Sequence, residues 1–164
     1  MDCNLLSPYK VIKTEDFDYT FVTKDDVVYR AYFLDVSYLH PQFSDAYSFN
    51  IEPVGDTDST RHPMDRRIGV TIVSILKEFF MKNENSMLMA CDNMDGKEDK
   101  RRKLFDRWYD NYSDNSLIKL DAALENEIYK LHVSMYIGKL NPRREQLVSA
   151  FNELIKTDLY ELVI

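Results

Sequence analysis

The chain has 164 residues, 45% of them hydrophobic and 30% charged, with only four Gly and five Pro. This is the length of one ordinary domain with a single sizeable core, and it excludes a collagen-like or low-complexity chain. The net charge of −7 belongs to residues 1–60, which hold eleven acidic and four basic residues, whereas residues 61–164 hold 17 of each. A chain-wide basic footprint is absent, so we expect no nucleic-acid partner.

The sequence also lacks the usual signs of export or membrane insertion. Asp2 stands where a signal peptide is basic, and no apolar run of signal-peptide length follows it. No stretch approaches the roughly 20 apolar residues of a membrane span. Cys3 and Cys91 are far apart, and neither belongs to a CxxC motif or a His/Cys cluster. We therefore expect a cytoplasmic protein with no membrane contact and no metal centre.

The first half of the chain has the residue pattern of β-strands. Aromatic and β-branched residues fill 17–23 and 27–36 on either side of a polar turn, which predicts a hairpin. Apolar and polar residues alternate from Ala46 to Pro53, which predicts a third strand. Residues 54–62 are polar and indicate a loop.

From Asp65 the apolar spacing becomes helical. The residues concerned are Ile68, Ile72, Ile75, Leu76, Phe79 and Phe80. They predict a helix of about 15 residues with one face in the core. The continuously apolar run 87–91 is typical of a strand buried on both faces. A strand–helix–strand unit of this kind normally forms a parallel pair.

The rest of the chain predicts a helix at 96–112, strands at 118–122 and 129–137, and a last helix. This helix is expected to begin at Asn141–Pro142, with a capping Asn and Pro in its first turn. The resulting order is β-β-β-α-β-α-β-β-α. It predicts one α+β domain, residues 1–164, around a mixed, mainly antiparallel sheet.

The strongest candidate for a ligand site is the start of the helix after the third strand. The segment there is Arg66-Arg67-Ile68-Gly69-Val70-Thr71. Free N–H groups at a helix start favour a phosphate, and Gly69 lets a ligand approach the backbone closely. The alternative interpretation is that Gly69 is a packing residue and that both arginines are solvated.

This segment resembles the cofactor loop of the GNAT N-acetyltransferase superfamily, Q/R-x-x-G-x-G/A. Arg66 occupies its first position and Gly69 that of its glycine, while Thr71 replaces the final Gly or Ala. The order of elements from Phe17 to Ile137 is also similar. The resemblance implies a GNAT-like fold that binds acetyl-CoA or another acyl-CoA and acylates a small-molecule or protein amine. The implied cofactor-binding residues are Arg66, Arg67, Ile68, Gly69, Val70, Thr71 and Asn93.

The resemblance also implies a tyrosine general acid on the second helix. Phe105, which has no hydroxyl, stands nearest to that position, several residues later than the pattern has it. Tyr109, one turn further on, is the candidate acid or else a core residue. Glu52, on the polar side of its strand, is the candidate base. A GNAT-like protein that has lost catalysis stays an alternative.

A rival hypothesis is a non-catalytic interaction protein of the antitoxin, immunity or anti-defence type. Its acidic first sixty residues would steer a basic protein partner. A third is a small-molecule site at 91–97, where a strand end meets a basic helix start; the alternative there is a solvated charged face. His132 is a candidate acid or base, or else a surface residue or a residue beneath the last helix. The stretch from Met87 to Tyr109 also resembles small uncharacterised bacterial proteins.

Overall fold

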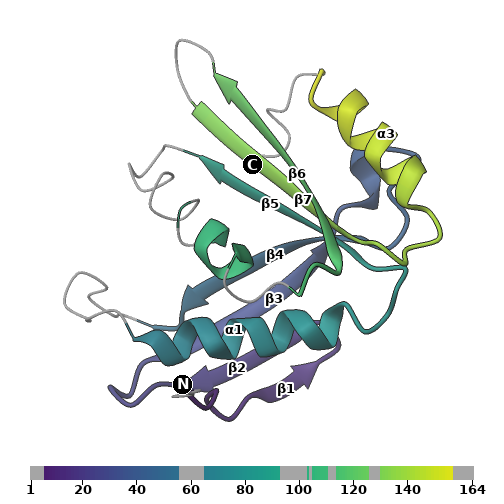
Figure 1. Cartoon of the computed structure of the whole chain (residues 1–164). Coiled ribbons are helices and arrows are strands. Elements are labelled where there is room, and N and C mark those ends of the chain that lie inside the picture. Colours follow the sequence, from purple (N-terminus) through teal and green to yellow (C-terminus); the bar gives the residue numbers. More distant parts are fainter. Residues whose placement is uncertain are drawn as a thin grey trace. The chain divides into compact units, whose positions relative to one another are not determined.

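The computed structural model describes residues 6–55, 65–92, 103, 105–110, 114–125 and 130–156. Figure 1 shows the order of their elements, with helical residues at 103 and 105–110 between β5 and β6. The elements are β1 (Ile12–Glu15), β2 (Asp18–Val22), β3 (Val28–Asp35), η1 (Ser37–Leu39), β4 (Ala46–Pro53), α1 (Arg66–Phe79), β5 (Ser86–Asp92), β6 (Leu117–Glu125), β7 (Lys130–Gly138) and α3 (Arg144–Leu154).

The seven strands form one sheet in the order β1-β2-β3-β4-β5-β7-β6. β4 pairs with β5 in parallel through three residue pairs that join 46–48 to 86–88. The pairs β1–β2, β2–β3, β5–β7 and β6–β7 are antiparallel. The α+β class and the mixed, mostly antiparallel sheet are therefore confirmed, as is the parallel strand–helix–strand unit.

The chain divides into two compact units, and the division falls within strands. The first unit is Met1–Leu34 with Phe49–Met81, and the second is Asp35–Ser48 with Lys82–Ile164. β3 and β4 therefore each contribute residues to both units. No helix among the described residues has the length and hydropathy needed to cross a membrane.

The first unit has an aromatic core beneath α1. The rings of Phe33 and Phe79 stack with centroids 4.2 Å apart, and Phe49 packs against Phe33 at 5.1 Å. Ile75 and Ile72, one and two turns before Phe79 respectively, are buried. The apolar stripe expected for this helix therefore faces the core, and Asp65, where the change of period was seen, is its N-cap residue.

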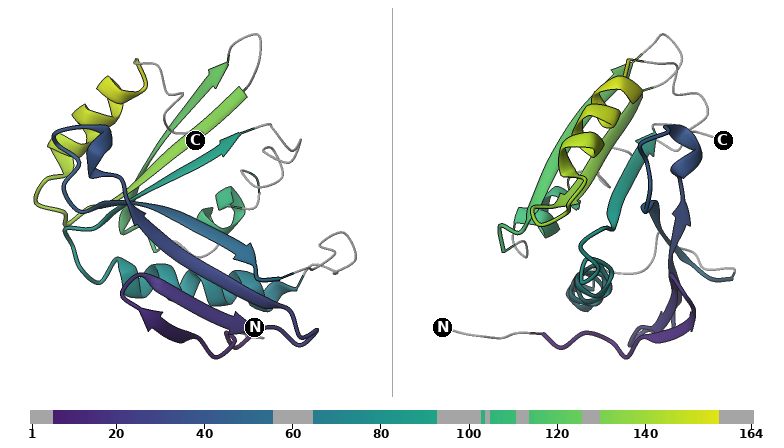
Figure 2. Two further views of the ribbon diagram at one scale, coloured as in Figure 1. Left: turned by 180° about the vertical axis from the view of Figure 1, so that it is seen from behind. Right: turned by 90° about the vertical axis from the view of Figure 1, so that its right-hand side faces the viewer.

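The second unit packs helical residues on the two faces of its strands (Figure 2). On one face, odd-numbered residues of β7 such as Val133 and Met135 form a core with Leu147 and Phe151 of α3. On the other face, Tyr136 contacts Tyr109 of the helical segment. Alternation along β7 thus separates an apolar face from a face with polar side chains.

β1 and the start of the last helix differ from the sequence prediction. β1 was not predicted, because all four of its residues are exposed and they show no buried face. The start predicted for the last helix was wrong, since α3 begins at Arg144. The side chain of Asn141 accepts from Arg143 N and donates to the carbonyl of Glu84, so Asn141 and Pro142 form a turn anchored to a distant segment.

Candidate functional site

The start of α1 is capped by its own chain. Oδ1 of Asp65 accepts a hydrogen bond from the backbone N of Arg67 at 2.9 Å. The carbonyl of Asp65 accepts from the N–H of Ile68 at 3.0 Å. Two of the first N–H groups of the helix are therefore satisfied, and a carboxylate already lies at the positive end of the helix dipole.

Tyr9 lies in the segment before β1 and connects that segment to the start of α1. Its hydroxyl donates to Oδ2 of Asp65 and accepts from the N–H of Lys24 at 3.2 Å. Its backbone N donates to Oγ1 of Thr71 at 2.8 Å. Tyr9 is only 7% exposed, and burial together with the hydrogen bond to Asp65 raises the pKa of its phenol. The tyrosine is therefore a neutral donor at physiological pH.

The two arginines of the motif have different surroundings. The guanidinium of Arg67 lies 3.9 Å from the ring centroid of Tyr9, and its Nε donates to the carbonyl of Ser7 at 3.0 Å. Arg66 is exposed. The sequence suggests the same role for both arginines. In the structure, Arg67 contacts Ser7 and Tyr9, whereas Arg66 is exposed to solvent.

The remaining motif residues lie in the first turns of α1. Gly69 and Thr71 are buried, and Ile68 and Val70 are half-buried. Oγ1 of Thr71 donates to the carbonyl of Arg67 at 2.6 Å while it accepts from Tyr9 N. The threonine that departs from the GNAT pattern is thus a structural link between α1 and the segment before β1.

The other candidates do not share one unit. Glu52 is exposed near the end of β4, in the first unit. Tyr109 belongs to the second unit, where its hydroxyl donates to the carbonyl of Leu117 at 3.1 Å. Asn93 and the other residues of the 91–97 rim after residue 92 lie outside the described residues.

A polar cluster beside Tyr109 was not found from the sequence. Nζ of Lys119 pairs with the carboxylate of Asp106, lies 3.6 Å from Oδ1 of Asp121 and lies 5.5 Å from the ring centroid of Tyr109. Burial lowers the pKa of Lys119, but hydrogen bonding to Asp106 and the charges of both aspartates outweigh it, so the pKa is raised. Lys119 therefore stays cationic and holds the helical segment on β6.

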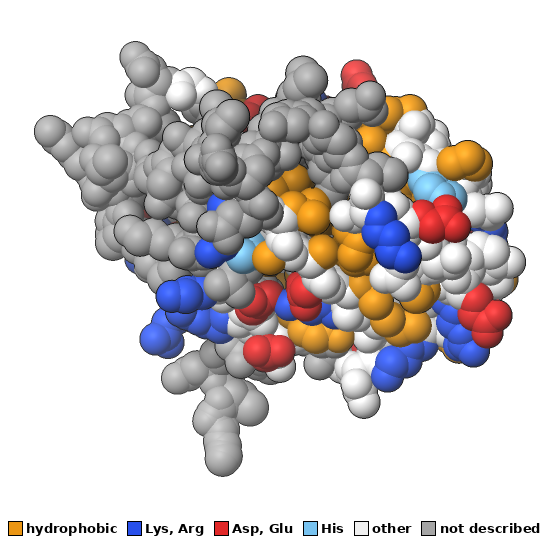
Figure 3. All heavy atoms as spheres, turned by 90° about the horizontal axis from the view of Figure 1, so that it is seen from above, with side chains coloured by type: hydrophobic (Ala, Val, Ile, Leu, Met, Phe, Trp, Pro, Cys, Tyr) orange, Lys and Arg blue, Asp and Glu red, His pale blue; other side chains and the backbone are white. Residues whose placement is uncertain are grey.

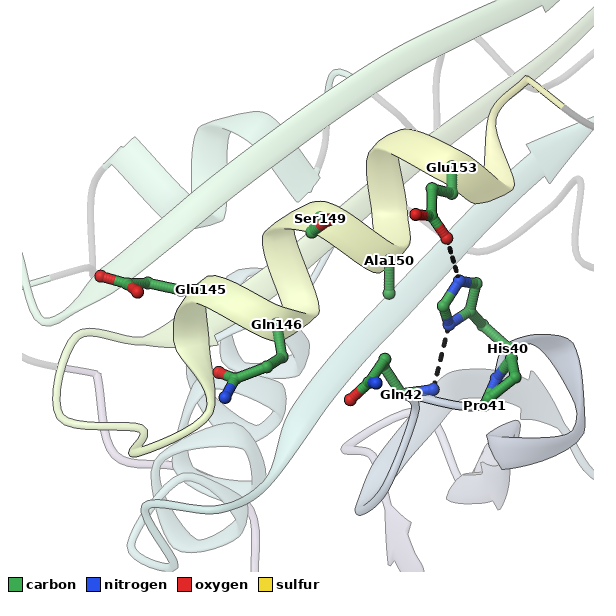
Figure 4. Close-up of a pocket in the computed structure, with 8 residues that line it drawn as sticks. All are labelled: His40, Pro41, Gln42, Glu145, Gln146, Ser149, Ala150 and Glu153. Carbon is green, nitrogen blue, oxygen red and sulfur yellow. Dashed lines mark hydrogen bonds and ion pairs between the residues drawn. The ribbon is translucent and has the colours of Figure 1, made fainter.

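A groove of about 710 Å³ lies between residues 40–42 and α3 (Figure 4). Nε2 of His40 is 2.6 Å from Oε2 of Glu153, and Nδ1 of His40 accepts from the N–H of Gln42 at 3.0 Å. His40 is not among the candidate residues that the sequence predicts. Its partner lies 113 positions away, so no local pattern identifies the groove.

The charges of the described residues are mixed. On the face drawn in Figure 3, acidic and basic side chains are interspersed among hydrophobic ones. No group of three or more His, Cys, Asp or Glu within the described part of the chain is arranged to hold a metal ion.

Comparison with known proteins places the chain in a family. The model of DUF6169, a family of unknown function, matches residues 64–153, or 90 of the 164 residues. The chain belongs to the DUF6169 family. The DUF6169 match contains α1, Tyr109 and all of α3 except Leu154, but not Glu52 or His40. No curated protein and no solved structure matches the chain.

Proposed function

We propose that this DUF6169 protein binds an acyl-coenzyme A at the start of α1 and acylates an amine. The observation that carries the proposal is an exposed cation, Arg66, at the first position of a helix that connects the parallel strands β4 and β5. Ligands of open α/β sheets commonly bind beside such strand–helix junctions, and helix starts favour phosphates. The order of elements and the Arg66–Thr71 segment support the GNAT-like interpretation.

The capping carboxylate limits how a phosphate can bind. Asp65 would repel an anion placed on the axis of α1, because like charges in proximity are unfavourable. A pyrophosphate would therefore be held to the side of the helix, by the guanidinium of Arg66. We expect weak binding that depends strongly on this one side chain and on salt.

The proposed transfer needs a base and an acid. The amine nitrogen attacks the thioester carbonyl carbon, the C–S bond breaks, and the amine proton passes to the base while the thiolate gains a proton from the acid. Tyr109 is the proposed acid by resemblance, and Glu52, which is exposed near the end of β4, is the proposed base. The hydroxyl of Tyr109 would have to leave the carbonyl of Leu117 to act in this way.

Calorimetric titration of the full chain with acetyl-CoA tests the binding. We expect saturable heat that the Arg66→Ala variant weakens about fivefold or more, consistent with loss of a charge-assisted contact. Lys77→Ala, which removes a cation from the last turn of the same helix, is the matched control and should leave binding unchanged. Absence of heat at millimolar acetyl-CoA would refute the cofactor proposal.

We propose an interaction protein as the second candidate, on a different observation. The chain on either side of β2 exposes four acidic residues, namely Glu15, Asp16, Asp25 and Asp26. Such a surface would accelerate association with a basic protein. The proposal would be supported by a stoichiometric protein partner whose binding is lost in moderate salt and in the Asp25→Lys, Asp26→Lys double variant. Binding that ignores both changes would contradict it.

A further inference from the structure

The groove beside α3 presents hydrogen-bonding groups from two walls. Gln42 projects from the loop wall and Gln146 from α3, and the small side chain of Ala150 lies between α3 and the loop (Figure 4). An amide side chain both donates and accepts, as a peptide backbone does. Oε1 of Gln42 accepts from Nη2 of Arg143 at 3.0 Å, which fixes the position of the amide.

The lining of the groove carries two negative charges. They belong to Glu145 and Glu153, which Figure 4 shows toward opposite ends of α3. Nδ1 of His40 accepts a hydrogen bond from Gln42 N, and its Nε2 lies 2.6 Å from Oε2 of Glu153, so His40 contacts one oxygen of that carboxylate. The other lining residues are Pro41, Gln42, Gln146, Ser149 and Ala150.

The two carboxylates have a defined spacing. Glu145, Ser149 and Glu153 follow at four-residue intervals, so they lie along one side of α3. At 1.5 Å per residue the two glutamates are about 12 Å apart along the helix axis. In an extended peptide, residues i and i+4 point to the same side and are about 13 Å apart.

We propose that this groove binds an extended basic peptide segment of a partner protein, with two lysines or arginines four residues apart. The cations would pair with Glu145 and Glu153, while the amides of Gln42 and Gln146 contact the peptide backbone between them. This inference does not depend on acyl transfer, because every group it uses lies in the second unit.

Fluorescence anisotropy with the full chain at low salt tests the proposal. The probe is a labelled, blocked nine-residue peptide with lysines at its third and seventh positions and small neutral residues elsewhere. The matched peptide has the same composition with lysines at its fourth and sixth positions. We expect the first peptide to bind at least threefold more tightly. Equal affinities, or no saturable binding at millimolar protein, would overturn the proposal.

Protein variants locate the contact. Glu145→Gln and Glu153→Gln should each weaken binding about two- to fivefold, the range of an exposed ion pair. Glu153→Gln still offers His40 an acceptor, so the groove keeps its form. Glu78→Gln, on α1 of the first unit, removes equal charge elsewhere and should leave affinity unchanged. Equal effects of all three changes would show a non-specific charge effect and refute the site.

A competition experiment distinguishes a peptide from a polyamine. If spermidine displaces the peptide at concentrations that match the affinity of the peptide, the groove is a polyamine site and the peptide assignment is overturned.

Discussion

The hydroxyl of Tyr9 lies between the carboxylate of Asp65 and the backbone N–H of Lys24, donating to the first and accepting from the second. One side chain thereby joins the segment before β1, the turn after β2 and the start of α1. Removing it in Tyr9→Phe should cost about 1–3 kcal/mol, since the hydroxyl bonds a charged group in a buried setting. Urea unfolding measures this cost.

Two comparisons show whether the Tyr9–Asp65 bond is responsible. Tyr38→Phe removes a hydroxyl from a residue that is 69% exposed, and it should change stability by less than about 0.5 kcal/mol. In an Asp65→Ala background the cost of Tyr9→Phe should fall markedly, because contacting residues are coupled. Additive costs would mean that the bond contributes nothing measurable.

We expect Arg67 to contribute to the stability of the fold and Arg66 to contribute to ligand binding instead. Arg67→Ala removes both the cation–π contact with Tyr9 and the hydrogen bond to Ser7, so we expect a loss of about 1–2 kcal/mol. Arg66→Ala should leave the unfolding free energy within about 0.5 kcal/mol of the parent. Thermal and urea unfolding of the two variants check the difference. Equal losses would contradict the distinct roles assigned to them.

A bidentate ion pair makes the first unit sensitive to acid. Nε and Nη2 of Arg30 donate to Asp18 at 3.0 and 2.7 Å, and this hydrogen bonding lowers the pKa of Asp18. A lowered carboxyl pKa stabilises the fold above the unfolded value of about 3.9, and the stabilisation is lost as pH falls through the folded value. Asp18→Asn should therefore be less stable than the parent at pH 7 and converge with it near pH 2. A constant difference between pH 7 and pH 2 would contradict this, and Asp25→Asn is the exposed control.

Tyr109 allows the structural and catalytic roles to be distinguished. Tyr109→Phe removes the bond to the carbonyl of Leu117, so stability should fall by about 1 kcal/mol. If Tyr109 is also the general acid, kcat for acyl transfer should fall at least tenfold while KM is retained. Release of coenzyme A measured by thiol titration gives both constants. A stability loss with kcat unchanged would leave Tyr109 a structural residue only.

Regular periodicity explains which elements the sequence predicted well. β4 was predicted with the bounds it has, and Val133 and Met135 lie in the core as their alternation indicated. β1 has no such pattern: it is an edge strand, and even Ile12 is 55% exposed. The sequence predicts Asn141 as a helix cap. The hydrogen bond from its side chain to the carbonyl of Glu84 leaves no local pattern, because the two residues are 57 positions apart.

The candidate site was less predictable, because its chemistry depends on distant partners. Arg66 and Arg67 are adjacent and identical in type, and contacts of Arg67 with Ser7 and Tyr9, more than fifty residues earlier, make them different. His40 and Glu153 meet only through the fold. A motif identifies candidate side chains. The residues that contact those side chains in the fold determine which of them remain available to a ligand.

The short parallel ladder between β4 and β5 also determines how this protein can be shortened. The region that matches DUF6169 begins at residue 64, whereas the partners of Ser86–Leu88 are Ala46–Ser48. A fragment limited to the matched region would leave that border of β5 with unpaired N–H and C=O groups. Such a fragment would be prone to aggregate through this exposed strand edge. The boundaries of the family match are therefore unsuitable as boundaries of an expressed fragment.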